Sequence, residues 1–174
     1  MKETKKITVS AMFVALGTVF MVLAGVFDTM TLTAAAFASL LVMLIFLEIG
    51  AGYAVAVWLC TTLATALCNF GSTVWVEYFL LFGIYPILKA VIERRRRPLW
   101  IPLKLGFLTA GVALLYTVTV YFFGLPFFDQ DTPVFKILTL VLALAVFFVF
   151  DRLLTLSSRF YFQTLQPRMR RFFH

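Results

Sequence analysis

The stretch Ile137-Leu-Thr-Leu-Val-Leu-Ala-Leu-Ala-Val-Phe-Phe-Val-Phe150 decides the fold of this chain, because it is apolar on nearly every side. A strand of a membrane β-barrel would alternate apolar and polar residues at every second position. Open β-structure is excluded in lipid, where unpaired backbone groups have no water to bond. The stretch therefore predicts a membrane-spanning helix.

The composition of the whole chain indicates a membrane protein. Of its 174 residues, 63% are hydrophobic and only 13% are charged, whereas soluble domains average about 45–50% apolar and about 25% charged residues. Disorder is excluded as well, because so much apolar surface needs burial. A spanning helix takes about 20 residues, so six spans occupy roughly 120 positions. Only short loops and tails are left, with no room for an extramembrane catalytic or nucleotide-binding domain.

Six apolar stretches follow one another along the chain, and we expect each of them to be a helix. The first is longer than the core of a signal peptide, which is about 7–15 residues, and it leads directly into further spans, so we expect it to be retained. The predicted fold is an all-α integral membrane protein with six transmembrane helices in a single membrane domain, residues 1–174. The expected helices run from about Ile7–Val26, Leu32–Leu47, Ala51–Leu67, Val74–Val91, Leu105–Phe122 and Val134–Leu154.

Basic residues mark the cytoplasmic side of a membrane protein. With the N-terminus placed inside, fourteen of the fifteen lysines and arginines fall on the cytoplasmic side, and only Lys136 falls outside. Both termini are therefore predicted to be cytoplasmic. The net charge of +7 then marks orientation, with Arg94–Arg97 near anionic headgroups, and it does not indicate a nucleic-acid partner.

The C-terminal residues 155–174 mix basic and aromatic side chains. Phe160, Phe162, Phe172 and Phe173 stand among arginines there. We expect a basic interfacial cytoplasmic tail that lies on the inner face of the membrane and contacts lipid. An ordinary membrane anchor is the simplest role for such a tail.

The chain offers few groups for catalysis. Its only histidine is His174, the last residue, so we expect neither a histidine base nor a metal cluster inside the membrane. Cys60 and Cys68 are separated along one helix by a rise of about 12 Å, which is too far for a disulfide. A phosphate-binding loop for ATP hydrolysis is missing from the sequence. We expect no enzymatic activity, no cofactor and no metal.

Polar side chains at membrane depth gather toward the outer half, where each is expected to line a cavity or to find a partner. Lys136 is the only cation near them, so a site built from them would suit a neutral or cationic organic molecule. The alternative is an interfacial belt, where Trp and Tyr concentrate in any membrane protein. The candidate substrate-binding residues are Asp28, Asn69, Trp75, Glu77, Tyr78, Tyr121 and Asp129.

The fourth stretch is the most unusual of the six. Pro86 removes the hydrogen bond to the carbonyl of Phe82 and should kink the helix near Gly83. A partly polar stripe within a sector of about 60° is predicted to face inward. A kinked helix with such a stripe would wall a cavity; alternatively, the kink fixes helix packing and Lys89 snorkels to the inner surface. The stripe consists of Tyr78, Phe82, Tyr85 and Lys89.

Small residues at a spacing of four occur in two of the expected helices. Ala11 and Ala15 have this spacing in the first, and Ala34 and Ala38 repeat it in the second. The spacing lets another helix approach closely. That helix belongs either to this chain or to a partner, and the spacing alone leaves both open.

Two short stretches, together with the six-helix layout, carry a family resemblance. Ile7-Thr-Val-Ser-Ala-Met-Phe-Val-Ala-Leu16 resembles the first-helix Ala-x-x-x-Ala motif of the substrate-binding (S) components of bacterial energy-coupling factor (ECF) transporters. Val76-Glu77-Tyr78 is similar to a Glu-Tyr pair in their thiamine-specific members. The resemblance implies a multi-pass protein of the bacterial cell membrane that captures a vitamin or similar micronutrient from outside.

The resemblance also implies partners and residue roles. Ala11 and Ala15 would dock onto a membrane coupling subunit, which works with two cytoplasmic ATPases. Glu77 and Tyr78 would contact the substrate. Thiamine-specific members carry further Trp, His and Asn residues in the fifth and sixth helices, whereas Leu115–Phe123 has none of these types, so the substrate is unassigned.

Two other functions compete with this interpretation. A membrane scaffold or assembly protein without a small-molecule ligand is the main alternative. A self-standing ion-coupled carrier or channel is disfavoured, because the sequence has no paired intramembrane charges and no broken-helix repeats.

Overall fold

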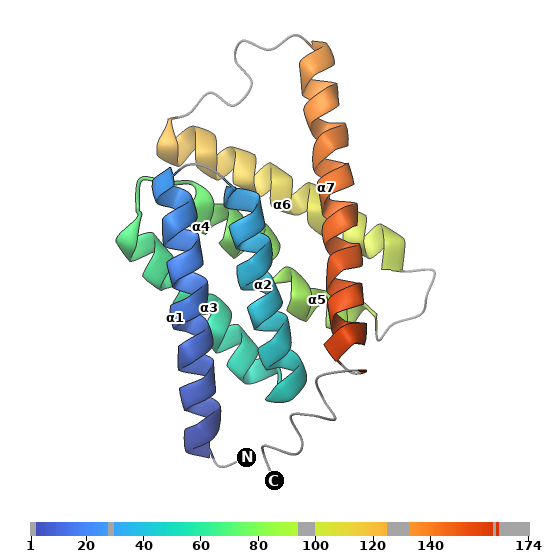
Figure 1. The fold of residues 1–174 in the computed structure, drawn as a ribbon. Helices are drawn as coiled ribbons and strands as arrows, with labels where there is room; N and C mark the ends of the chain where they lie inside the picture. Colours follow the sequence, from blue (N-terminus) through green and yellow to red (C-terminus); the bar gives the residue numbers. More distant parts are fainter. Residues whose placement is uncertain (1–2, 28–29, 94–99, 125–132, 162, 164–174) are drawn as a thin grey trace. The chain divides into compact units, whose positions relative to one another are not determined.

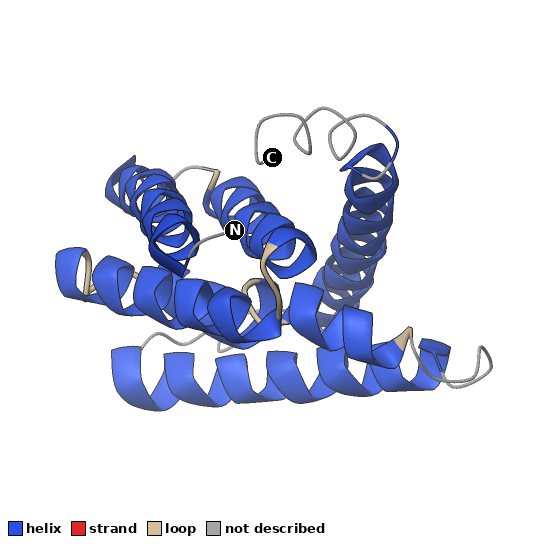
Figure 2. Ribbon diagram, turned by 90° about the horizontal axis from the view of Figure 1, so that it is seen from below, coloured by secondary structure: helices blue, strands red, loops and turns tan. Residues whose placement is uncertain are grey.

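The fold is described from a computed structural model. Two units make up the chain, residues 1–115 and residues 116–174, and each is described by itself. Every element drawn in Figures 1 and 2 is a helix, and the described residues contain no strand, which confirms the all-α prediction. The structure describes residues 3–27, 30–93, 100–124, 133–161 and 163.

Among the described residues, six segments are long and apolar enough to cross a membrane, as predicted. Five of them are continuous helices. Both α1 and α6 begin earlier than expected, and α7 continues through the first residues of the predicted tail, whereas the single-domain prediction stays a prediction. The continuous helices are α1 (Glu3–Phe27), α2 (Thr31–Glu48), α3 (Ala51–Cys68), α6 (Trp100–Phe123) and α7 (Pro133–Phe160).

A turn of two residues, Ile49 and Gly50, connects α2 to α3. Gly50 has a φ of +127°, a conformation that is open to glycine and strained for other residues. The backbone N–H groups of Ile49 and Gly50 both donate to the carbonyl of Ile45, at 2.9 and 3.2 Å. These bonds close the end of α2, and the short turn makes α2 and α3 neighbours.

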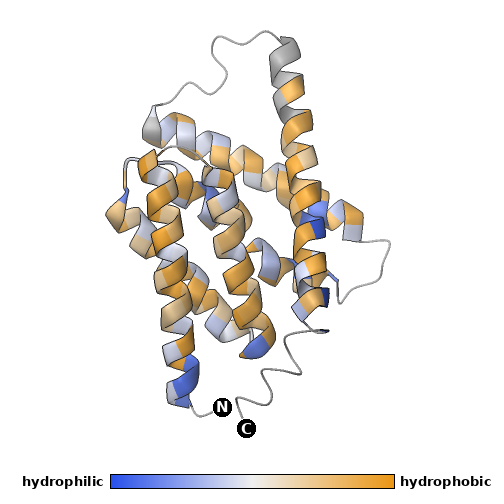
Figure 3. Cartoon of the chain, in the orientation of Figure 1, coloured by the Kyte–Doolittle hydropathy of each residue, from blue (hydrophilic) through white to orange (hydrophobic). Residues whose placement is uncertain are grey.

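The first three helices pack against one another in the first unit. A methyl group added at Gly17 of α1 would lie 3.3 Å from Cγ2 of Thr61 and 3.7 Å from Cδ1 of Leu41, so α1 approaches both neighbours closely. In Figure 3 α1 and α2 are mostly hydrophobic, and their most hydrophilic residues lie at the first turn of α1 and the last turn of α2. Close packing holds helices together in lipid, where burial of apolar surface is not the driving force. Buried small residues of α2 contribute to it: Ala34, Ala35, Ala38 and Ser39.

The fourth span is interrupted near Gly83, as predicted. The Gly83 N–H donates to the carbonyl of Tyr78 at 2.7 Å, five residues back, which is the π-helical pattern. Pro86 stands in the first turn of the helix that follows, where its missing N–H breaks no helical bond. The three parts are α4 (Val74–Glu77), the π-helical segment η1 (Tyr78–Phe82) and α5 (Tyr85–Ile92).

All four members of the predicted inward stripe are buried, and Lys89 is only 5% exposed. The Lys89 Nζ lies 3.7 Å from Oε1 of Glu93, and the same oxygen lies 3.2 Å from Nζ of Lys104 in α6. The ammonium thus points toward Glu93, one turn nearer the predicted cytoplasmic end of the span, and snorkelling of Lys89 to the inner surface stays a prediction. The Glu93 carboxylate is thus shared by two ammonium groups, those of Lys89 and Lys104.

Candidate functional site

The connection between α3 and α4, residues 69–73, forms a tight turn on the predicted outer side, named here the outer turn. The Asn69 N–H donates to the carbonyl of Thr65 at 2.9 Å, and the Ser72 N–H donates to the carbonyl of Asn69 at 3.2 Å. The Ser72 Oγ accepts a hydrogen bond from the Val74 N–H at 3.3 Å. These bonds place a short polar segment directly before α4.

The side chain of Asn69 joins the outer turn to α1. A methyl group added at Gly25 would collide with the Asn69 amide and would lie 3.3 Å from Oγ of Ser72. The Asn69 Nδ2 is buried and has no hydrogen-bond partner among the described residues. Leaving a buried donor unbonded costs about 1–3 kcal/mol, so this amide is suited to bind a ligand or a water molecule.

Glu77 ends α4, one helical turn after the outer turn. The Thr73 hydroxyl donates to Oε1 of Glu77 at 3.2 Å, and the glutamate side chain is half-buried. The pair forms because residues four apart on a helix face each other. A carboxylate at membrane depth is costly and usually functional.

Tyr78 follows Glu77 directly but is fully buried, with 0% exposure. Its ring packs beside Gly83, where an added methyl group would lie 3.0 Å from Cζ. Its polar neighbour on α3 is the side chain of Thr61. The hydroxyl has no hydrogen-bond partner among the described residues.

Trp58 of α3 is a polar group that sequence reasoning missed. Its ring stacks on Phe79, with centroids 5.1 Å apart and planes 10° apart. Its Nε1 is buried without a hydrogen-bond partner among the described residues, and it would lie 2.7 Å from a methyl group added at Gly83. Trp58 and Tyr78 therefore bring two unbonded donors to the same glycine. A tryptophan in the middle of an apolar span, away from the interfacial belts, was the available signal.

The other predicted site residues are placed differently. The ring of Trp75 stacks on Phe70 at 6.0 Å, and its Nε1 donates to the Phe70 carbonyl at 3.4 Å, so it covers the outer turn. Tyr121 belongs to the second unit and is 86% exposed. Asp28 and Asp129 lie outside the described residues. Asn69, Trp75, Glu77 and Tyr78 all lie in the first unit and are close along the chain.

The two alanine pairs have opposite surroundings. Ala11 and Ala15 of α1 are exposed, whereas Ala38 of α2 is 1% exposed and Ala34 is also buried. The exposed pair lies on a face of α1 that also carries exposed apolar residues: Met12, Leu16 and Val19. This face of α1 is free to contact lipid or a partner helix.

The N-terminal end of α1, predicted to be cytoplasmic, contacts the start of α3. The Tyr53 hydroxyl donates to Oε2 of Glu3 at 2.7 Å, and Nζ of Lys6 lies 2.6 Å from Oε1 of the same glutamate. All three groups are near the surface, so the contribution to stability is small. The Tyr53–Glu3 bond joins the first turn of α1 to the first turn of α3.

The described side chains include no cluster of three or more His, Cys, Asp or Glu residues that could hold a metal ion. Cys60 and Cys68 are exposed free thiols.

A protein-family model matches residues 5–156 of the chain, and its description is ECF transporter, substrate-specific component. The matched range includes Ala11, Ala15, the outer turn, Glu77 and Tyr78. No curated protein and no solved structure matches the chain.

Proposed function

Because the chain belongs to the substrate-specific components of ECF transporters, we propose that it captures a vitamin or similar micronutrient at the outside of a bacterial cell membrane. As a member of this family it is the substrate-binding subunit of an ECF transporter, and it is a transport subunit, not an enzyme. It associates with the membrane and ATPase subunits of that transporter. Family membership favours this function over a scaffold without a ligand.

The proposed substrate site begins at the outer turn. The observation that carries the proposal is the buried Asn69 amide, which has no hydrogen-bond partner among the described residues and stands on the segment that leads to Glu77. A ligand with an acceptor for Asn69 and a cationic or N–H group for Glu77 would satisfy both groups.

A neutral or cationic ligand also fits the charges on the predicted outer side. Asp28 and Asp129 stand in the sequence at outer connections, and Lys136 is the only basic residue predicted there. We propose Asp28 for this site, with Trp75 as an aromatic face for a cation or a ring. Asp129 and Tyr121 belong to the second unit, and their part in binding stays a prediction from sequence.

Tyr78 would form the inner end of the proposed site. Its hydroxyl and the Nε1 of Trp58 are buried donors beside Gly83. Either donor would bond an acceptor on the part of a ligand that reaches deepest into the membrane. Buried donors of this kind need a partner.

Ala11 and Ala15 are the proposed docking surface for the membrane coupling subunit. Their exposure supports this assignment, because a small-residue face that is already covered by the chain's own helices could not dock. The basic side chains of the tail, residues 155–174, are proposed to contact anionic lipid on the cytoplasmic side.

The substrate site is tested by the small molecule that stays with the purified protein. We expect Glu77→Gln to lower the amount retained at least tenfold, because the charge that binds the cationic or N–H group is removed. Mass spectrometry of the molecules released on denaturation measures the amount. Glu48→Gln, the same change at the cytoplasmic end of α2, is the matched control and should change nothing.

Equal retention by the Glu77→Gln variant and the wild type would remove Glu77 from the site. Loss of the molecule from both variants would point to a general effect of acidic residues on the protein, and would equally contradict the proposed site.

A further inference from the structure

Two hydrogen-bond donors meet at the break in the fourth span. A methyl group added at Gly83 would lie 2.7 Å from Nε1 of Trp58 and 3.0 Å from Cζ of Tyr78. The π-helical turn places Tyr78 beside this point, because the Tyr78 carbonyl accepts the hydrogen bond of the Gly83 N–H, five residues later. All three residues belong to the first unit.

The described part of the protein satisfies neither donor. The Trp58 Nε1 and the Tyr78 hydroxyl are both buried and have no hydrogen-bond partner among the described residues. Tyr78 is 0% exposed, so its hydroxyl is closed to bulk water. Buried donors without partners are rare and unfavourable, so the two groups are suited to bind a ligand atom that accepts.

The indole of Trp58 is oriented before a ligand arrives. Its ring stacks on Phe79, with centroids 5.1 Å apart and planes 10° apart. Phe79 is the neighbour of Tyr78 along the chain, so the same contact ties the indole to the segment that carries the hydroxyl. Donors that are held in place in advance lose less conformational entropy when they bind.

The chemistry of the two groups selects the kind of atom that they bind. The indole N–H is a donor only, so an ammonium or N–H group of a ligand could not bond it. Neither side chain carries a charge to balance a carboxylate, which is costly to bury unpaired. A neutral acceptor fits both groups: a carbonyl oxygen or an unprotonated ring nitrogen.

We propose that Trp58 and Tyr78 form a donor pair that binds a neutral acceptor group of the substrate at the inner end of the site. The donor pair deepens the proposed function, on which it rests: Glu77 takes the cationic or N–H end of the substrate, and the pair takes the acceptor end. A site built to bond a polar group rejects analogues that lack it. The pair therefore sets both the orientation and the class of the substrate.

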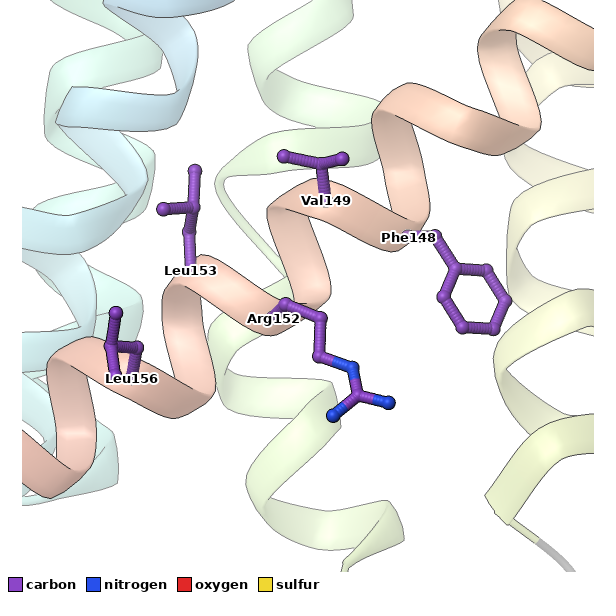
Figure 4. A pocket seen from close by; sticks show the side chains of 5 residues that line it. All are labelled: Phe148, Val149, Arg152, Leu153 and Leu156. Atoms are coloured by element: carbon purple, nitrogen blue, oxygen red, sulfur yellow. The ribbon is translucent and has the colours of Figure 1, made fainter.

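The hollow on α7 in the second unit offers a ligand different chemistry (Figure 4). Its lining comes from one helix and is almost wholly apolar. Such a surface provides apolar contact, whereas polar groups fix the orientation of a bound ligand. The buried donors of the first unit are therefore better suited to select a substrate. The hollow is lined by Phe148, Val149, Arg152, Leu153 and Leu156.

Retention of the small molecule that copurifies with the full chain tests the donor pair. Trp58→Phe removes the indole N–H and keeps a ring to stack on Phe79, and Tyr78→Phe removes only the hydroxyl. Each should lower the amount retained about fivefold, as measured by mass spectrometry after denaturation. Tyr53→Phe removes a hydroxyl that bonds Glu3 in the first turn of α3. It is the matched control and should change nothing.

The indole N–H resonance of Trp58 reports the hydrogen bond itself, which a purely structural role would not change. The chain has three tryptophans, and the resonance of Trp58 is the one that is absent from the spectrum of isotope-labelled Trp58→Phe. We expect this resonance to move downfield when the molecule is bound and to return when it is washed out. The resonance of Trp100, at the start of α6, should stay in place.

Unchanged retention in Trp58→Phe or Tyr78→Phe, together with loss of the molecule from Glu77→Gln, would overturn the donor pair and leave the proposed function standing. An indole resonance that is the same with and without the molecule would show that another group, such as water, satisfies the donor, and would equally overturn the pair. A wild type that retains no molecule would contradict the proposed function and the pair together. Unfolding temperatures confirm that the variants are folded.

Discussion

The alanine pairs of α1 and α2 have the same spacing but opposite positions in the molecule. Ala34 and Ala38 are buried where α2 packs within the first unit, whereas Ala11 and Ala15 are exposed on the outside of α1. A spacing of four between small residues indicates that another helix can approach closely. Only the burial of these residues shows whether that helix belongs to the same chain. The buried pair therefore serves folding, and we assign the exposed pair to a partner.

The largest effect on stability is expected from a large side chain in the buried pair. Ala38→Phe overpacks a position with 1% exposure and should lower the free energy of unfolding by about 3 kcal/mol. Ala15→Phe, the matched change in the exposed pair, should change it by less than about 0.5 kcal/mol. Thermal unfolding in detergent measures both. Equal destabilisation by the two substitutions would contradict the different burial of the two alanine pairs.

Two glycines offer a second comparison between a closely packed position and an open one. A methyl group at Gly83 meets the rings of Trp58 and Tyr78, whereas a methyl group at Gly52 meets nothing within 4 Å. Gly83→Ala should therefore cost about 2 kcal/mol, and Gly52→Ala should be neutral or stabilise by about 0.5–1 kcal/mol through helix propensity. The unfolding temperatures of the two variants check this, and a stable Gly83→Ala variant would show that Trp58 does not pack as described.

The smallest effect is expected at the outer turn, and it concerns binding. Asn69→Ala removes a buried donor that has no hydrogen-bond partner among the described residues, so it should spare the fold and lower retention of the bound small molecule about fivefold. Thr33→Ala removes an exposed hydroxyl that already bonds the Met30 carbonyl, and it should not change retention. Retention that is equal in the two variants would exclude the Asn69 amide from the site.

The six spans could be predicted from sequence because the length and hydrophobicity of a span follow from bilayer thickness. The break near Gly83 and the inward stripe followed from Pro86 and from helical periodicity. The π-helical turn could not be predicted, because it depends on how Tyr78 and Gly83 pack against α3. The ion pair of Lys89 with Glu93 and the role of Trp58 also depend on tertiary contacts.

The candidate site was harder to predict than the spans. Asn69, Trp75, Glu77 and Tyr78 are close in sequence and stay together in the first unit. Tyr121 was grouped with them from its expected depth alone, and depth does not say which helices face each other. It belongs to the second unit, so its part in the site stays a prediction.

The most direct test of the account separates docking from binding in one purification from native membranes. We predict that the variant with Ala11→Trp and Ala15→Trp loses the coupling subunit and the ATPases but keeps its small molecule, because the exposed face of α1 is blocked and the outer turn is untouched. Glu77→Gln is predicted to give the reverse result: the partners stay and the small molecule is lost. Loss of partners and small molecule together in both variants would contradict the assignment of two functions to two surfaces.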